Sequence, residues 1–273
     1  MAHHHHHHME LTEITPESLR LRPSHKERNV LITGAARGIG RAIAQAFVER
    51  SATVGICDLN LADVARTCEE LNGLGLGRAV PIACDVSDYD ALVAAIDDTG
   101  LVFDTVVNNA GISPKHNGVA HKVWEMAPDE WRRVVDVNLT GTFNTIRALT
   151  PGMVEARRGW IVNTSSVAGK TYSPIVACHY AATKSAIIGF TKHLAAELGP
   201  YSIRVNAMAP GRIATPMVAG VAPEVNAEQV KLTPMARLGQ PAEVADVALW
   251  LTSTESSFVT GQTVDVAGGL YMA

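Results

Sequence analysis

The residues best suited to acid–base chemistry are Tyr180 and Lys184. They lie four positions apart in a stretch that we expect to be helical, so their side chains share one face. A free tyrosine has a pKa of about 10, which is poorly matched to work at neutral pH. A nearby positive charge stabilises the phenolate and lowers that pKa. Tyr180 would then serve as a general base toward an alcohol or a general acid toward a carbonyl.

A glycine-rich turn supplies a context for this pair. Gly34, Gly38 and Gly40 follow the apolar run Asn29–Thr33, and a helical pattern opens at Gly38. Gly34 permits a tight turn, Gly38 lets the backbone approach a pyrophosphate, and Gly40 allows close helix packing. The helix N-terminus offers free N–H groups to the anion. An ordinary strand–helix turn is the alternative, so the three glycines indicate a phosphate-binding turn only together with the neighbouring residues.

Two charged residues bear on which dinucleotide would bind. Asp58 ends the second apolar run, eighteen residues after Gly40, where a carboxylate can accept hydrogen bonds from an adenosine ribose diol. The same carboxylate would repel the 2′-phosphate of NADP. Arg37 could instead pair with that phosphate, although a solvated surface arginine is the plain alternative. We give Asp58 more weight and predict NAD, with NADP possible.

Taken together, these motifs resemble one family. Gly34–Gly40 has the spacing GxxxGxG, and the chain also contains Asn108-Asn109-Ala110-Gly111 and Tyr180-Ala181-Ala182-Thr183-Lys184. With Pro210-Gly211 and the terminal Val266–Gly269, they make the chain similar to short-chain dehydrogenases/reductases from about Asn29 to the C-terminus. The length resembles that of the compact branch of this family.

The resemblance implies a catalytic set of Asn138, Ser166, Tyr180 and Lys184. Ser166, rather than Ser165, would hydrogen-bond the substrate oxygen where negative charge develops. Lys184 would also bind ribose hydroxyls, and Asn138 would connect Lys184 to solvent through a water. Fourteen positions separate Ser166 from Tyr180, one more than is common in the family, and a one-residue loop insertion would account for this.

The resemblance also implies the cofactor contacts. Asp85 and Val86 would meet the adenine, Asn109 the inner ribose, and Ile213 and Thr215 the nicotinamide carboxamide. The full cofactor-binding set is Gly34, Arg37, Gly38, Ile39, Gly40, Asp58, Asp85, Val86, Asn109, Tyr180, Lys184, Ile213 and Thr215.

The elements that must position these residues follow from the hydrophobic pattern. From Asn29 onward, short apolar runs alternate with helical patterns, which indicates a parallel sheet covered on both faces. We predict an α/β fold with one Rossmann-like, doubly wound parallel sheet of about seven strands. The expected strands are 29–33, 52–58, 79–85, 103–107, 160–163, 203–207 and 262–266.

The helices have their own signals. One long helix is expected to start at Pro128 and another to run from about Cys178 to Leu198. Ser87 and Asp90 resemble a capping box. The helix from Pro128 is expected to bury its apolar positions, which are Trp131, Val135, Leu139, Phe143 and Ile146.

No linker or repeat divides the 273 residues. Residues 1–8 are an expression tag, residues 9–28 a loose N-terminal arm, and residues 29–273 a single catalytic domain. Within that domain, residues 211–240 hold too many helix breakers for a steady element. We expect them to form a substrate lid.

The composition excludes several classes of protein. Hydrophobic residues make up 47% of the chain and charged residues 18%, which fits a globule with a sizeable core. A net charge of −4 argues against nucleic-acid binding. No apolar run could span a membrane and no signal peptide follows Met9, so we predict a cytoplasmic protein. His116, His121 and His179 lack metal-ligand spacing, so no metal site is predicted.

Three functions remain open. We favour an NAD(H)-dependent oxidoreductase for a small polar molecule such as a sugar, polyol or hydroxy acid, assembled as a homotetramer by resemblance. The alternative is an NADPH-dependent 3-oxoacyl-(acyl-carrier-protein) reductase, which Gly268–Met272 resembles. Such reductases bind an acidic carrier protein through basic residues near the mouth of the active site, and Arg157 and Arg158 could fill part of that role. A second basic residue is expected just after the helix that carries the tyrosine, and this chain has Tyr201 near that position, which argues against the reductase. A non-catalytic NAD(H) sensor would be expected to have lost the tyrosine or the lysine.

Lys115 begins a polar stretch after the fourth expected strand, at the edge of the sheet where substrates bind in such folds. It could contact a polar or anionic group of the substrate, and a solvated loop is an equally good interpretation.

Overall fold

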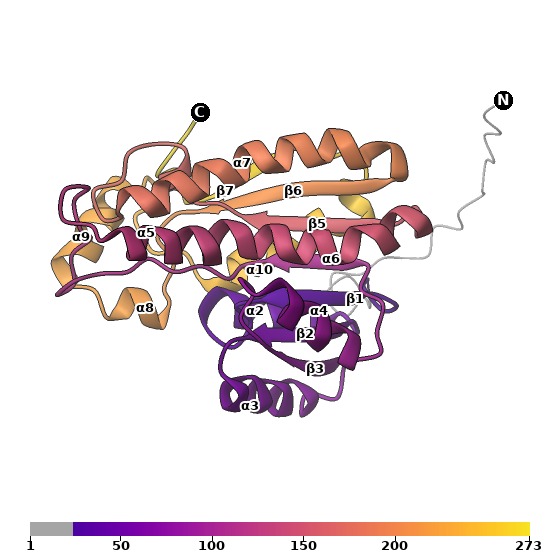
Figure 1. Cartoon of the computed structure of the whole chain (residues 1–273). Helices are drawn as coiled ribbons and strands as arrows, with labels where there is room; N and C mark the ends of the chain where they lie inside the picture. The colour runs from indigo at the N-terminus through magenta and orange to yellow at the C-terminus, as the bar shows by residue number, and fades with distance from the viewer. Residues whose placement is uncertain (1–23) are drawn as a thin grey trace.

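The computed structural model describes residues 24–273, so the expression tag and most of the N-terminal arm lie outside the described residues. Seven parallel strands form one sheet in the order β3-β2-β1-β4-β5-β6-β7 (Figure 1). This confirms the predicted α/β fold. The strands are β1 Asn29–Thr33, β2 Thr53–Asp58, β3 Arg78–Ala83, β4 Thr105–Asn108, β5 Gly159–Thr164, β6 Ile203–Pro210 and β7 Thr263–Val266.

The strands are apolar throughout because both faces of the sheet are covered. In β1, Val30 and Ile32 belong to one hydrophobic cluster, whereas Leu31 belongs to a second cluster on the other side. This is the alternation of side chains that a strand imposes. The first face carries α2 Gly38–Glu49, α3 Leu61–Asn72 and α10 Pro241–Leu251, and the second carries α4 Tyr89–Asp98, α6 Gly141–Ala156 and α7 Cys178–Leu198 (Figure 1).

The helix predicted from Pro128 begins there but is not regular. It runs as α5 Pro128–Val135, a π-helical turn over Asp136–Thr140, and then α6. The prediction that its large apolar side chains are buried is wrong for Trp131 and Phe143, which are 41% and 49% exposed. Ile146 is buried as predicted, and small and polar residues are buried as well, namely Asn138, Gly141, Thr142 and Thr145.

The cap predicted for α4 is also wrong. Asp88 is the N-cap, and its carboxylate accepts a hydrogen bond from the backbone N–H of Ala91. Ser87 donates its hydroxyl to Asp85 Oδ1 at 2.7 Å, so it is committed to the turn before the helix.

The carboxyl ends of the strands meet at one edge of the sheet, and the direction of strand order reverses between β1 and β4. Such a switch point opens a crevice that binds ligands in this class of fold. The segment 211–240, predicted as a lid without steady structure, contains two short helices, α8 Pro216–Ala219 and α9 Pro223–Leu232. No helix within residues 24–273 is both long and apolar enough to cross a bilayer.

Candidate active site

The glycine turn lies at the end of β1, and its backbone demands glycine at two points. Gly34 and Gly38 have φ of +63° and +54°, a region that side chains with a Cβ disfavour. At Gly40 a Cβ would lie 2.0 Å from the carbonyl oxygen of Gly34. The backbone at Gly40 therefore packs tightly against the backbone at Gly34, and the first residues of α2 line the pocket. This is the cradle that a pyrophosphate needs.

Asp58 is fixed at the end of β2. Its Oδ2 accepts a hydrogen bond from the N–H of Ala36 at 3.0 Å, and its Oδ1 accepts one from the N–H of Leu59 at 2.8 Å. The carboxylate is thus tied to the glycine turn and lines the same pocket. Arg37 also lines the pocket, but its guanidinium forms an ion pair with Asp63 at 2.8 Å and its side chain is 75% exposed.

Two further predicted contacts lie beside the pocket. Asp85 accepts hydrogen bonds from the N–H and hydroxyl of Ser87. Burial alone would raise the pKa of Asp85, but these bonds and the nearby Arg133 hold it below its usual value. Val86 is buried, and its carbonyl accepts a hydrogen bond from Asn144 at 2.8 Å.

Asn109 follows β4, and its N–H donates to the hydroxyl of Thr33 at 3.0 Å. On the far side of the pocket, Ile213 is 4% exposed and bridges to Gly239. Thr215 caps α8 by accepting a hydrogen bond from Val218 at 3.3 Å. These contacts hold three separate loops at one edge of the sheet.

Tyr180, Ser166 and Lys184 come together at the carboxyl end of β5. Ser166 accepts a hydrogen bond from the N–H of Ala168 at 3.1 Å, whereas Ser165 is buried and donates to the carbonyl of Lys184. Ser166 is close enough to the phenol of Tyr180 to influence its pKa by hydrogen bonding. The geometry places Ser166, not Ser165, beside the tyrosine.

The electrostatics differ from the simplest expectation. Burial raises the pKa of Tyr180, although the hydrogen bond with Ser166 and the charge of Arg212 oppose this rise. The ammonium of Lys184 lies 5.4 Å from the ring centre of Tyr180 and donates to the carbonyl of Thr164 at 3.0 Å. Burial lowers the pKa of Lys184 to about 8. With a pKa of about 8, Lys184 still carries most of its positive charge at neutral pH.

Asn138 lies in the π-helical turn, a feature that often marks functional sites. Its Oδ1 accepts from the N–H of Ile112 at 2.8 Å and its Nδ2 donates to the carbonyl of the same residue at 3.0 Å. A Cβ built on Gly111 would be 3.4 Å from both Asn138 Oδ1 and Lys184 Nζ. Asn138 therefore reaches the surroundings of Lys184 while clamping the loop after β4.

A single pocket of about 1090 Å³ joins these parts. All predicted site residues line it except Gly40 and Asn138, which support it from behind. The glycine turn, the hydrogen-bonded carboxylate of Asp58 and the loops that follow β4 and β6 fit a dinucleotide. Its adenosine end would lie toward β2 and β3, and its reacting end toward Tyr180.

Sequence reasoning missed Arg212, which lines the pocket directly after Pro210-Gly211. A cation that follows a strand at the carboxyl edge is a signal that could have identified it. Lys115, left open by the sequence, also lines the pocket.

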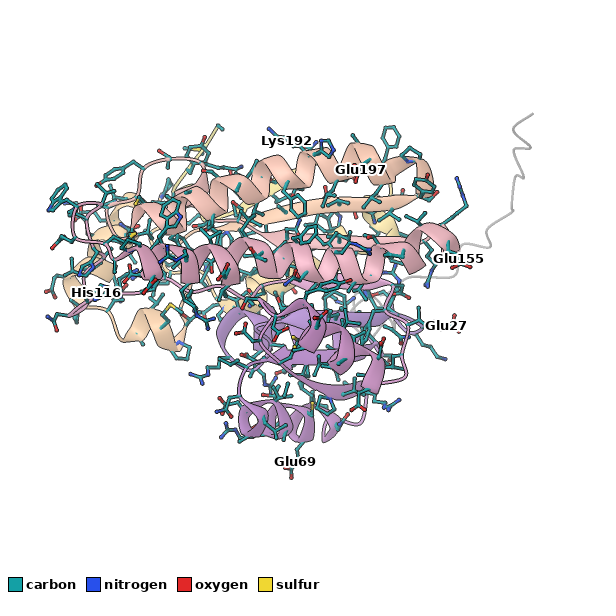
Figure 2. All side chains as sticks on the ribbon, in the orientation of Figure 1. Glu27, Glu69, His116, Glu155, Lys192 and Glu197 are labelled. Atoms are coloured by element: carbon teal, nitrogen blue, oxygen red, sulfur yellow. The ribbon has the colours of Figure 1, made fainter. Side chains whose placement is uncertain are left out.

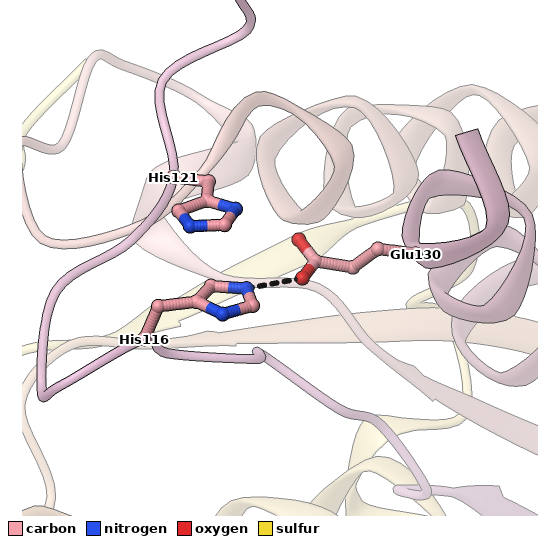
Figure 3. A group of neighbouring side chains, drawn as sticks. All are labelled: His116, His121 and Glu130. Carbon is pink, nitrogen blue, oxygen red and sulfur yellow. Dashed lines mark hydrogen bonds and ion pairs between the residues drawn. The ribbon is translucent and has the colours of Figure 1, made fainter. Parts of the chain in front are cut away.

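A cluster of histidines lies next to the site and was not expected from spacing. The rings of His116 and His121 stack with their centres 3.4 Å apart, and Glu130 accepts from His116 at 2.5 Å (Figure 3). Glu130 also bonds His179 at 2.8 Å, and His179 is fully buried beside Tyr180 in the chain. The ligand atoms of the first three lie within 4.8 Å of one another. The stacked rings are parallel, so their lone pairs do not converge on one point, and Glu130 serves instead to tie the loop after β4 to α5 and α7.

Comparisons with known proteins show which family this chain is similar to. A sequence profile described as enoyl-(acyl carrier protein) reductase matches residues 34–271. A 3-oxoacyl-(acyl-carrier-protein) reductase of Thermotoga maritima is 40% identical over 243 residues, which is 88% of this chain and 96% of the relative.

Two solved structures are also similar. A crystal structure described as a 3-oxoacyl-(acyl-carrier-protein) reductase with bound NAD from Brucella melitensis has 98% identity and a TM-score of 0.91, and it covers 98% of this chain and 100% of that one. A putative gluconate dehydrogenase from Agrobacterium tumefaciens has 32% identity and a TM-score of 0.86, with 93% and 100% covered.

Proposed function

The chain belongs to the short-chain dehydrogenase/reductase family, and from this premise we propose that it interconverts 3-hydroxyacyl and 3-oxoacyl compounds with NAD(H). It is an oxidoreductase acting on CH–OH groups. The named relatives favour the acyl substrate, which the sequence suggested only as the alternative, over a sugar or polyol.

The observation that carries this proposal is the grouping of Tyr180, Ser166 and Lys184 at one end of a dinucleotide-sized pocket. A nicotinamide cofactor, when bound, supplies or accepts the hydride. Tyr180 donates the proton to the carbonyl oxygen during reduction, or accepts it from the hydroxyl during oxidation. Ser166 holds that oxygen in place, and Lys184 adds positive charge beside the phenol.

The preference for NAD follows from the two charged residues at the adenosine end. Asp58 is held at the glycine turn by two backbone N–H groups, where it meets the ribose diol. Arg37 forms an ion pair with Asp63, and it would have to give up this ion pair to bind a 2′-phosphate. The relative with bound NAD supports the same choice.

The carrier of the acyl group is a separate matter. Arg158 pairs with Asp104 at 2.7 Å, and Arg157 lies over the ring of Tyr201 at 5.6 Å. Both arginines precede β5, at the amino edge of the sheet, and neither lines the pocket. Figure 2 shows Glu155, just before them, at the end of the molecule opposite His116. Within one chain these arginines do not border the active-site mouth.

A small hydroxy acid, which the sequence also predicts, is a second candidate substrate. Lys115 and Arg212 both line the pocket, and the putative gluconate dehydrogenase is named for a substrate of this kind.

We also propose a homotetramer. Trp131 on α5 and Phe143 on α6 are large apolar side chains that one chain leaves exposed, and a second copy would cover them. Light scattering should give four times the chain mass at micromolar concentration, and Phe143→Asp should lower that mass. A monomer in the unaltered protein would contradict this. The cytoplasmic location stays a prediction.

The function is tested by following NADH absorbance with a panel of 3-oxoacyl thioesters, 3-oxo acids, sugars and polyols. We expect turnover confined to 3-oxo compounds and faster with NADH than with NADPH. Efficient turnover of sugars or polyols without 3-oxo activity would overturn the proposal.

A further inference from the structure

Two cations face the pocket from opposite loops. Lys115 follows β4 and Arg212 follows β6, and both line the pocket that holds Tyr180 and Ser166. Each strand ends at the carboxyl edge of the sheet, so the two side chains approach the reacting end from different sides. Neither residue belongs to the cofactor or catalytic set discussed above.

Arg212 is held by a neutral partner. Its Nε and Nη2 donate to Asn226 Oδ1 at 3.1 and 2.9 Å, and Asn226 in turn donates to the carbonyl of Val218 at 2.9 Å. Within residues 24–273, Arg212 has no carboxylate partner, and its Nη1 makes no hydrogen bond. A guanidinium carries five N–H donors, so most of its capacity is left for something else. Asn226 orients the charge without neutralising it.

Lys115 has the same character. Its ammonium donates to the hydroxyl of Ser113 at 2.7 Å and to the carbonyl of that residue at 3.3 Å, and it pairs with no carboxylate among the described residues. Burial of the ammonium and the charge of Arg212 lower the pKa of Lys115. The positive charges of Lys115 and Arg212 are therefore close enough to repel each other. By contrast, Lys170 pairs directly with Asp265 at 2.8 Å.

Holding two like charges near each other costs free energy unless an anion joins them. Arg212 also lies close enough to Tyr180 for each to influence the pKa of the other. An anion bound by Arg212 would therefore belong to the molecule whose oxygen faces Tyr180. A neutral thioester in that place would leave both charges unpaired.

We propose that Lys115 and Arg212 bind a carboxylate of the substrate, so that the preferred substrate is a short 3-hydroxy or 3-oxo acid in its free, anionic form. A planar carboxylate suits the donor fork of arginine, and the lysine adds a second contact from the opposite loop. Because Asn226 lies in α9, the lid helix also takes part in setting the position of the guanidinium. The proposal rests on the oxidoreductase function and narrows its substrate class.

The direct test measures binding without turnover. Isothermal titration of the NAD⁺-saturated protein with butyrate and with butyramide compares an anion with its neutral analogue. We expect butyrate to bind at least about tenfold more tightly, since a hydrogen bond to a charged group contributes at least that much. Arg212→Gln and Lys115→Gln should each remove most of this difference. Lys122→Gln, an exposed lysine of the same loop, is the matched control and should retain it.

Two results would overturn the proposal. One is equal binding of butyrate and butyramide by the unaltered protein. The other is a loss of NAD⁺ affinity in Arg212→Gln as large as its loss of butyrate affinity, because the cation would then serve the phosphates of the cofactor.

A second measurement separates this proposal from the proposed function. The kcat/KM for 3-hydroxybutyrate is compared with that for its ethyl ester, and the acid-to-ester ratio should fall about tenfold in Arg212→Gln. A higher kcat/KM for thioesters or esters than for the acid, with an unchanged ratio in the variant, would overturn the carboxylate site and leave the 3-oxoacyl function intact. If no 3-hydroxy compound reacted, the proposed function would fail, and the butyrate titration would still decide whether the anion site exists.

Discussion

The two ends of the pocket are built in different ways. The adenosine end is made mainly of backbone: Gly34, Gly38 and Gly40 shape the turn, and two N–H groups hold Asp58. The substrate end is made of side chains from remote loops, including Lys115 and Arg212, which pair with no carboxylate in the part of the chain that the structure describes. Backbone geometry presents one fixed shape, which suits a common cofactor. Long side chains can be exchanged without disturbing the sheet, which suits a substrate that differs among relatives.

The largest expected effect falls at the junction of the two ends. Tyr180→Phe removes only the titrating oxygen, so turnover should fall by a factor on the order of 10³ while NADH binding stays close to unchanged. Steady-state kinetics and fluorescence titration with NADH measure the two quantities. Retention of more than a few per cent of the original activity would show that another group moves the proton.

The backbone character of the adenosine end is tested by Gly40→Ala. The added methyl would lie 2.0 Å from the carbonyl oxygen of Gly34 and 2.6 Å from Asn109 Nδ2, so the turn must open. We expect a loss of more than about 3 kcal/mol in the free energy of unfolding, together with loss of NADH binding. Gly152→Ala in α6 is the control, since its Cβ meets no atom within 4 Å and alanine favours helix. Denaturant unfolding that showed the two variants to be equally stable would contradict the tight turn.

The same contrast explains what the sequence could predict. The strands and the glycine turn follow from local rules, namely apolar runs of strand length and positions where only glycine fits. The predicted burial of Trp131 and Phe143 is wrong because hydrophobicity alone does not identify the inner face of a helix. That face holds Ile146, but it also holds polar groups with partners, such as Thr145, which donates to Asn108 Oδ1 at 2.5 Å.

The substrate end was largely hidden for another reason. Arg212 and Lys115 are nearly a hundred positions apart, and only the parallel sheet brings their loops to one edge. The histidine and glutamate cluster is likewise assembled from α5, α7 and the loop after β4. No local sequence pattern predicts contacts between side chains that are so far apart in the chain. A motif of seven residues is enough to predict the cofactor-binding turn, whereas the substrate contacts depend on the tertiary fold.

The buried lysine between the two ends makes stability depend on pH. The pKa of Lys184 is about 8 in the folded protein, below its ordinary value of 10.5. Between these values the unfolded chain holds a proton that the folded chain has released, so the free energy of unfolding rises as the pH increases. Below pH 8 the full cost of burying the charge is present. In the protein without cofactor, Lys184→Met should therefore be more stable than the original at pH 7, by up to roughly 3 kcal/mol.

That advantage should shrink by pH 10, which unfolding curves at the two pH values would show. Lys192→Met, on the exposed side of the same helix, should show no such pH-dependent gain. A constant difference between Lys184→Met and the original protein would mean that the ammonium is not desolvated in the folded state.

The smallest of these effects concerns the choice between cofactors, and it sharpens the comparison most closely. Bringing a 2′-phosphate to Asp58 places two anions within a few ångströms, which costs several kcal/mol even at an effective dielectric constant of about 20. Arg37 can return only part of this, because it would have to leave Asp63 and an exposed pair contributes about 1 kcal/mol or less. NAD(H) should therefore be preferred by at least roughly tenfold in kcat/KM, which corresponds to about 1.4 kcal/mol. Asp58→Ala should shrink or reverse this preference, whereas Arg37→Ala should change it little. Both cofactors are measured against one accepted substrate, and an NADPH preference in the unaltered protein would mean that a cationic side chain, Arg37, outweighs the backbone-held Asp58 in selecting the cofactor.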